Sequence, residues 1–112
     1  MTISTEQIND VVIAKLRGKA LDASNSREFK AAATPLLVLK VKLVLNLEDI
    51  DFIDSTGLGA LVSCLREAHS SEGEIKLCGL TKRVRALFEL VRMHRVFEIF
   101  NNPLEATNSY GS

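Results

Sequence analysis

Residues 41–68 decide the fold of this chain and read VKLVLNLEDIDFIDSTGLGALVSCLREA. The first part of this stretch has a strongly apolar residue at every second position, namely at Val41, Leu43, Leu45 and Leu47. Such alternation predicts a β-strand with one apolar face. The last part has apolar residues at helical spacing, namely at Leu58, Leu61, Val62 and Leu65. This spacing predicts a helix with one buried stripe, so the chain passes from a strand into a helix.

The join between the strand and the helix is the tetrapeptide DSTG at residues 54–57. We expect Ser55 to be the N-cap, with its hydroxyl aimed at the backbone N–H of Gly57 or Leu58. Because Gly57 and Gly59 carry no side chain, a large group can approach the first turn closely. The free N–H groups and the positive end of the helix dipole then form an anion site, where a phosphate on Ser55 is stabilised without unfolding the helix. Taken alone, this tetrapeptide is more often a plain helix cap than a regulatory site.

The sequence around Ser55 gives the join a second interpretation. The segment DSTGLG at residues 54–59 follows a strand reading LVLNLED, and together they resemble the STAS domain of bacterial anti-sigma factor antagonists. Other parts of the chain resemble that family in the same order: the turn Gly18…Leu21-Asp22, the strand GEIKLCGL at residues 73–80, and the closing segments LFEL at 87–90 and VFEIF at 96–100. No piece is specific alone, but their order and spacing cover nearly the full length.

The resemblance implies a fold, partners and a site. The fold is a single α/β STAS domain over residues 1–112, with a mixed four- to five-stranded sheet, helices mainly on one face, and the last few residues as a disordered tail. The partners are an anti-sigma factor with serine kinase activity, which phosphorylates Ser55 (Thr56 is the second choice), and a PPM-type serine phosphatase that resets it. The implied partner-binding residues are Asp22, Asp54, Ser55, Thr56, Gly57 and Leu58. ATP and magnesium belong to the kinase, so the chain itself needs no cofactor or metal and is not an enzyme.

Composition limits the class of protein. The chain has 112 residues, 46% of them hydrophobic and 25% charged, which is typical of one globular domain. The formal net charge of zero gives no reason to expect binding to nucleic acid or to an anionic membrane. Cys64 and Cys78 have no metal-site spacing, and the N-terminus lacks the order of a signal peptide. We therefore expect a cytoplasmic protein in which both cysteines are reduced and serve as small apolar fillers.

Before the central stretch, the alternation at residues 11–17 predicts a strand with Val12, Ala14 and Leu16 on one face. Residues 1–6 form either an edge strand or a loose leader. A helix capped by Ser24, Asn25 or Ser26 should follow and break near Thr34, because Pro35 cannot continue its hydrogen bonds. Its apolar stripe is Phe29, Ala32, Ala33 and Leu36. Residues 36–40 fit either a last helical turn or an early strand.

After the central helix, residues 74–78 alternate as a strand with Ile75 and Leu77 inward, and Thr81 caps a further helix. The apolar stripe of that helix is Val84, Leu87, Phe88 and Val91. Its basic face is either solvated or a docking surface, and comprises Lys82, Arg83, Arg85, Arg92 and Arg95. Residues 96–100 should be a last strand. A brief tail helix follows Pro103, and Leu104 is the residue expected to dock.

Signals for catalysis are weak. Residues 57–62 lack the third glycine of a dinucleotide fingerprint, and no P-loop is present. His69 and His94 are not part of a zinc-ligand pattern, and the acidic residues before Ser55 are typical of a solvated turn. Three functions remain open: a phosphorylation-switched antagonist, a STAS scaffold of a larger signalling assembly without a phosphoswitch, and a small phosphate- or nucleotide-binding enzyme. The residues and the resemblance favour the first.

Overall fold

A mixed five-stranded sheet forms the centre of the computed structural model, which describes residues 1–111. Its strand order is β1 (Thr2–Ile8), β2 (Val11–Arg17), β4 (Lys42–Asn46), β6 (Glu74–Cys78) and β7 (Ile99–Phe100). β1 pairs antiparallel with β2, and the remaining pairs are parallel. A separate parallel pair joins β3 (Ala20–Leu21) to β5 (Phe52–Ile53). The helices are α1 (Ser26–Ala33), α2 (Ser55–Ser70), α3 (Lys82–Leu90) and α4 (Pro103–Ser109), with short 3-10 turns η1 (Thr34–Leu36) and η2 (Met93–Arg95).

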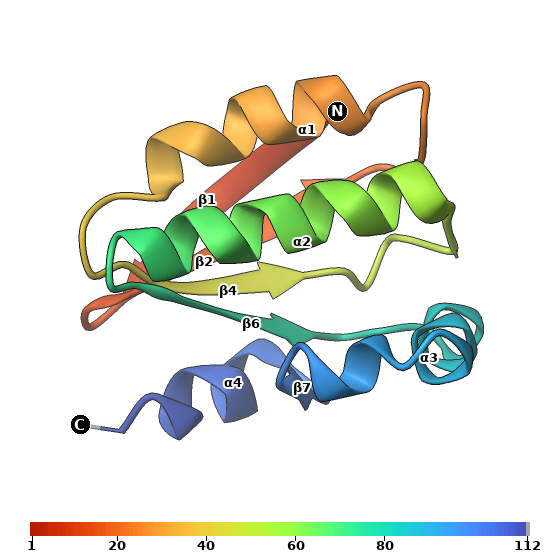
Figure 1. The fold of residues 1–112 in the computed structure, drawn as a ribbon. Coiled ribbons are helices and arrows are strands. Elements are labelled where there is room, and N and C mark those ends of the chain that lie inside the picture. Colours follow the sequence, from red (N-terminus) through yellow and green to blue (C-terminus); the bar gives the residue numbers. More distant parts are fainter. Residues whose placement is uncertain (112) are drawn as a thin grey trace.

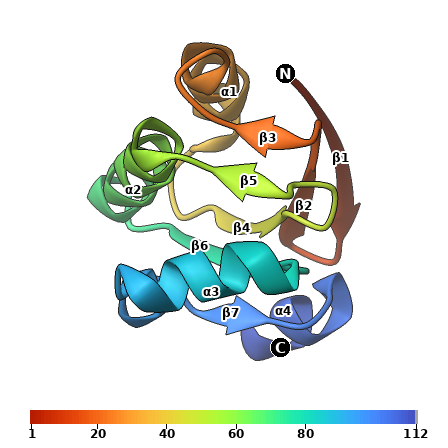
Figure 2. The ribbon, with the colours of Figure 1, turned by 90° about the vertical axis from the view of Figure 1, so that its right-hand side faces the viewer.

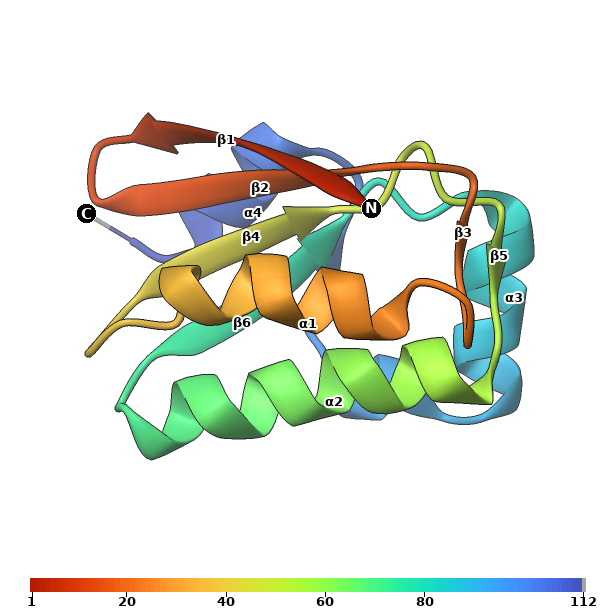
Figure 3. The same ribbon diagram turned by 90° about the horizontal axis from the view of Figure 1, so that it is seen from above.

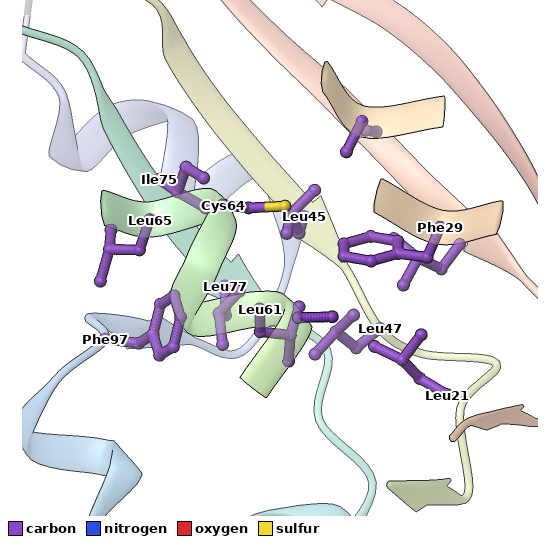
Figure 4. Packing of buried hydrophobic residues seen from close by; sticks show 14 of the residues in the cluster. Leu21, Phe29, Leu45, Leu47, Leu61, Cys64, Leu65, Ile75, Leu77 and Phe97 are labelled. Carbon is purple, nitrogen blue, oxygen red and sulfur yellow. The ribbon is translucent and has the colours of Figure 1, made fainter. Parts of the chain in front are cut away.

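The main hydrophobic core lies between one face of the sheet and α1 and α2. Figure 1 shows these two helices above the sheet and α4 below it. The core is formed where Phe29 of α1 and Leu61 of α2 pack against the inward residues of the strands (Figure 4). The labelled strand residues are Leu45, Ile75 and Leu77, and Leu47 follows directly after β4. This arrangement confirms the predicted sheet with helices mainly on one face.

The second face of the sheet is covered by α4 alone among the described helices. Its small cluster consists of Val11, Ile13, Val44, Cys78 and Ala106. Leu104 is the residue of this helix expected from the sequence to dock, which is wrong, because it is 63% exposed. The side chain of Asn102 caps α4 by accepting the Glu105 N–H at 2.9 Å. The residues that α4 buries against the sheet are Ala106 and Thr107.

Tyr110 binds the segment that follows α4 to the sheet. Its hydroxyl lies 2.7 Å from the Leu43 carbonyl oxygen and 3.0 Å from that of Glu74, so it can donate to two adjacent strands. The ring lies 4.3 Å from the ammonium of Lys76, which also donates to the Ser109 hydroxyl at 2.8 Å. Of the predicted disordered tail, Ser112 lies outside the described residues.

Several expected boundaries are confirmed and others shift. α1 ends at Ala33, as Pro35 predicts, and Thr81 caps α3 by accepting the Val84 N–H. The edge-strand alternative for residues 1–6 is confirmed, since β1 spans Thr2–Ile8, whereas of residues 36–40 only Leu36 is helical, as the last residue of η1.

The end of the chain differs most from the expected pattern. The last strand is only Ile99–Phe100, because the Phe97 N–H donates to the Met93 carbonyl and keeps the preceding residues in a turn. Val91 lies beyond the end of α3 and is 43% exposed, so it does not belong to the buried stripe.

The two cysteines are buried and unpaired, as expected of apolar fillers. Desolvation raises the pKa of Cys64 to about 11 and that of Cys78 to about 12. Among residues 1–111, none of the helices combines the length and the apolarity that crossing a bilayer requires.

We predict that Tyr110→Phe lowers the free energy of unfolding by about 1 kcal/mol, because the ring still packs while two strand carbonyls lose their hydroxyl donor. Leu104→Ala should change it by less than about 0.5 kcal/mol, because that side chain is largely solvated. Urea titration followed by circular dichroism measures both. A larger loss for Leu104→Ala than for Tyr110→Phe would mean that Leu104 is the docking residue after all.

Candidate functional site

The site is assembled where two turns lie side by side beyond the ends of β2 and β4. β3 and β5 pair in parallel, with Ala20 opposite Phe52 and Leu21 opposite Ile53 (Figure 2). Each of these short strands precedes a helix: residues 22–25 connect β3 to α1, and Asp54 alone connects β5 to α2. The pairing therefore brings the turn that contains Asp22 next to the start of α2, although Ala23 and Asp54, which bond across this contact, are 31 positions apart in the sequence.

The carboxylate of Asp54 links the two turns. One oxygen accepts the Gly57 N–H at 2.8 Å and caps α2, and the other accepts the Ala23 N–H at 3.0 Å. The backbone N–H of Asp54 also donates to the Leu21 carbonyl oxygen at 3.3 Å. Three hydrogen bonds thus tie this one residue to both α2 and the turn before α1.

Ser55 is not the N-cap, contrary to the sequence-based expectation. The extended backbone of Asp54, with φ −95° and ψ −177°, and its bond to Gly57 give Asp54 that role. Asp and Ser are about equally good caps, so the local sequence alone did not separate them. Ser55 is instead the first residue of α2, and both Ser55 and Thr56 are exposed. The Ser55 hydroxyl is therefore available at the surface.

The expected anion site is smaller than the sequence suggested. The Gly57 N–H donates to the Asp54 side chain and the Leu58 N–H donates to the Asp54 carbonyl at 2.9 Å. Of the N–H groups at the start of the helix, those of Ser55 and Thr56 remain available to bind an anion. The positive end of the helix dipole acts at the same place.

Asp22 lies on the neighbouring turn and is half-buried. One of its carboxylate oxygens accepts the Ser24 hydroxyl at 2.5 Å and the Ser24 N–H at 2.9 Å. These hydrogen bonds, the one from the hydroxyl first, hold the pKa of Asp22 below its usual value. The turn thus carries a fixed negative charge beside the Asp54 bridge.

The two glycines of the first turn serve different purposes. A Cβ atom on Gly57 would lie 2.2 Å from the Leu21 carbonyl oxygen, so its bare side faces the β3 turn and not an approaching group. A Cβ atom on Gly59 would meet nothing within 4 Å. Only Gly59 leaves the surface open beside Ser55, which corrects the expectation that both do.

An open hollow beside Ser55 was missed by the sequence analysis. It has a volume of about 520 Å³ and is lined by Ser55, Leu58, Gly59, Val62, Ser63, Arg66 and Met93. Most of these residues follow one face of α2 at helical spacing, which the sequence does show. Met93 comes from η2, however, and no local pattern in the sequence connects that turn with α2.

The site presents groups that another molecule can bind. His69 and His94 line a different hollow, with Glu74 and Glu98, and neither lines the one beside Ser55. Over residues 1–111, no three His, Cys, Asp or Glu side chains gather where they could hold a metal ion. The arrangement presents a hydroxyl, two carboxylates and a partly apolar hollow to another molecule.

Comparison with known proteins bears on this arrangement. The family model for the STAS domain matches residues 2–106. An anti-sigma-B factor antagonist of Staphylococcus aureus is 28% identical over 83 residues, which cover 73% of this chain and 77% of that protein. A crystal structure of a candidate anti-sigma factor antagonist from Thermotoga maritima has a TM-score of 0.84 at 27% identity, covering 96% of this chain and 92% of that one.

The fold also matches the anti-sigma factor antagonist SpoIIAA. Its unphosphorylated form has a TM-score of 0.76 at 21% identity and covers 97% of this chain and 96% of that one. The phosphorylated form, from Bacillus, has a TM-score of 0.68 at 20% identity and covers 97% and 99%. The likeness in fold thus extends to a protein solved in both states of phosphorylation.

We predict that Asp54→Ala lowers the free energy of unfolding by about 2 kcal/mol, because it removes the cap of α2 and the bond to Ala23 together. Ser55→Ala, at an exposed position, should change it by less than about 0.5 kcal/mol. Denaturant titration compares the two, with Asp54→Asn as the variant that keeps a cap. Equal losses in the free energy of unfolding for Asp54→Ala and Ser55→Ala would contradict the assignment of the cap to Asp54 and favour Ser55.

A second prediction separates the two glycines. Gly57→Ala should destabilise the protein by about 2 kcal/mol or more, because its new methyl group collides with the Leu21 backbone. Gly59→Ala should stabilise it by about 0.5 to 1 kcal/mol, because alanine favours the helix and the position is open. Thermal unfolding of the two variants beside the unmodified protein should move their midpoints in opposite directions.

Proposed function

The chain belongs to the STAS domain family, and on this basis we propose that it is an anti-sigma factor antagonist switched off by phosphorylation of Ser55. The observation that supports this most is the position of Ser55, an exposed hydroxyl at the first residue of α2. Because Asp54 performs the capping, the hydroxyl can be esterified without removing a bond that holds the helix. The kinase and the phosphatase supply all catalytic groups, and this chain supplies the acceptor.

In the unphosphorylated state, the proposed binding surface consists of the first turn of α2 and the adjoining turn. Its residues are Asp22, Asp54, Ser55, Thr56 and Leu58, whereas Gly57, which was expected among them, is buried against the Leu21 carbonyl. The open position at Gly59 supports this proposal, because a partner can approach the helix there without meeting a side chain. The bound partner is an anti-sigma factor with serine kinase activity, and its capture releases a sigma factor.

A phosphate at Ser55 would change charge without changing the fold. It adds about −1.5 to −2 charges at neutral pH. The carboxylates of Asp22 and Asp54 already lie around this position, so the added charge concentrates on an acidic surface. An unpaired or like-charged contact buried at an interface costs about 2 to 5 kcal/mol. At 1.4 kcal/mol per decade, that is roughly a 30-fold to several-thousand-fold loss of affinity.

The solved relatives support a switch of this kind. SpoIIAA retains a fold that matches this chain in both its unphosphorylated and phosphorylated forms. A modification that leaves the fold intact must act through the surface. A PPM-type phosphatase would then restore binding by removing the phosphate.

We predict that Ser55→Ala binds the anti-sigma factor kinase of the same organism constitutively and gains no phosphate. Ser55→Asp should keep the fold and bind at least about 30-fold more weakly. Isothermal titration calorimetry measures the affinities, and intact-mass spectrometry after incubation with kinase and ATP counts the phosphates. Thr56→Ala, which removes the neighbouring hydroxyl, is the matched control for the position of the phosphate and should still gain one phosphate.

Two results would overturn the proposal. Equal affinity of Ser55→Ala and Ser55→Asp for the kinase would remove the switch. Tight binding without any gain of phosphate would leave a scaffold without a phosphoswitch. Transfer of phosphate to Thr56→Ala but not to Ser55→Ala would identify Ser55 as the acceptor.

A further inference from the structure

β1 forms a free edge of the sheet. It is the first strand in the order β1-β2-β4-β6-β7, and Figure 3 shows it at the outer margin, away from α2. Its seven residues, TISTEQI, contain no proline or lysine and only one charge, at Glu6. Edge strands of monomeric proteins are usually protected by such residues, by bulges or by a covering element. This strand has a regular register with β2 along its whole length and none of the protecting residues.

The backbone of β1 presents a defined set of groups to a new strand. Hydrogen-bonded and non-hydrogen-bonded pairs alternate in an antiparallel ladder. Because the turn to β2 has two residues, Asn9 and Asp10, the flanking pair of Ile8 and Val11 is of the hydrogen-bonded type. The N–H and C=O groups of Ile3, Thr5 and Gln7 therefore point away from β2.

We propose that β1 pairs antiparallel with β1 of a second copy of this chain, about a two-fold axis at Thr5. In this register Thr5 lies opposite Thr5, Ile3 opposite Gln7, and Ser4 opposite Glu6. All seven residues of each strand find a partner, and the outward groups of Ile3, Thr5 and Gln7 meet their counterparts. Two five-stranded sheets join into one continuous sheet.

Charge complementarity supports a second copy as the occupant. The Nε of Arg17 on β2 donates to the Ser4 hydroxyl at 3.1 Å, which holds the guanidinium beside Ser4. Glu6 of the second copy lies opposite Ser4 in the proposed register. Side chains opposite each other in a non-hydrogen-bonded pair are the closest across a ladder, so this carboxylate comes next to Arg17. The two-fold axis produces the same ion pair twice.

Neighbouring registers fit less well. Shifting the axis from Thr5 to Glu6 places the two Glu6 carboxylates directly opposite each other, which is unfavourable. Shifting it to Ser4 leaves Ile8 without a partner strand. The pairing does not involve α2, so it is independent of the switch proposed for Ser55 and leaves both copies of that site uncovered.

Sedimentation velocity tests the pairing with the chain alone. A contact made by one strand is small, so we expect a weak dimer and a concentration range from about 10 µM to about 1 mM. The weight-average mass should rise from 12.3 kDa toward twice that value. Any purification tag belongs at the C-terminus, because Met1 directly precedes β1.

Backbone and charge variants locate the interface. Thr5→Pro removes an outward N–H at the axis without touching the ladder with β2, and should remain a monomer throughout. Glu6→Arg and Arg17→Glu should each weaken association about tenfold, because two pairs change per dimer. The double variant Glu6→Arg/Arg17→Glu should restore association. Glu67→Arg, an exposed site on α2 with the same change of charge, is the matched control.

Circular dichroism confirms that each variant is folded. A constant monomer mass up to about 1 mM would overturn the proposal. So would a dimer that survives Thr5→Pro, since it would use another surface. An effect of Glu67→Arg as large as that of Glu6→Arg would mean that net charge, and not the β1 pairing, controls association.

Discussion

The hydrogen bonds of the Asp54 carboxylate are the interaction on which the rest of the site depends. Its two oxygens bind donors from different parts of the chain, Gly57 in α2 and Ala23 in the turn before α1. Neither turn can shift without breaking one of these bonds. The side chain that determines the position of Ser55, the proposed phosphate acceptor, is therefore that of its neighbour Asp54, and the Ser55 hydroxyl takes no part in capping α2.

The surrounding fold makes this bridge possible. The β3–β5 pair holds the two turns together, and the absent side chain of Gly57 lets α2 approach the Leu21 carbonyl. Behind them, buried side chains of the sheet, α1 and α2 form one hydrophobic core. A change of charge at the exposed start of α2 thus alters the electrostatic potential of a surface whose shape is held by the core beneath it.

Much of the fold was predictable from the sequence, because periodicity and caps are local. The alternation of apolar residues predicted β2, β4 and β6, and Pro35 predicted the end of α1. The errors arose where residues distant in the sequence decide the outcome. Asp54 displaces Ser55 as the cap because it also binds Ala23, and Gly57 is enclosed because Leu21 lies against it.

The candidate site was predictable only in part for the same reason. The sequence indicated the exposed serine proposed as the phosphate acceptor, Ser55, and the open glycine at residue 59. It gave no sign that Met93 would complete a hollow with α2, because that contact depends on the path of the chain after α3. Likewise, α4 is too short for its apolar residues to define a face, so Leu104 was mistaken for the docking residue.

The cover of the second face has a consequence for biosynthesis. The side chains of Val11, Ile13 and Val44 pack under α4, which the ribosome makes after every strand of the sheet. A nascent chain that has already paired its strands still presents this apolar strip. Such transient surfaces attract chaperones and other unfinished chains. Burial of this strip is complete only when α4 has emerged and packed against the sheet.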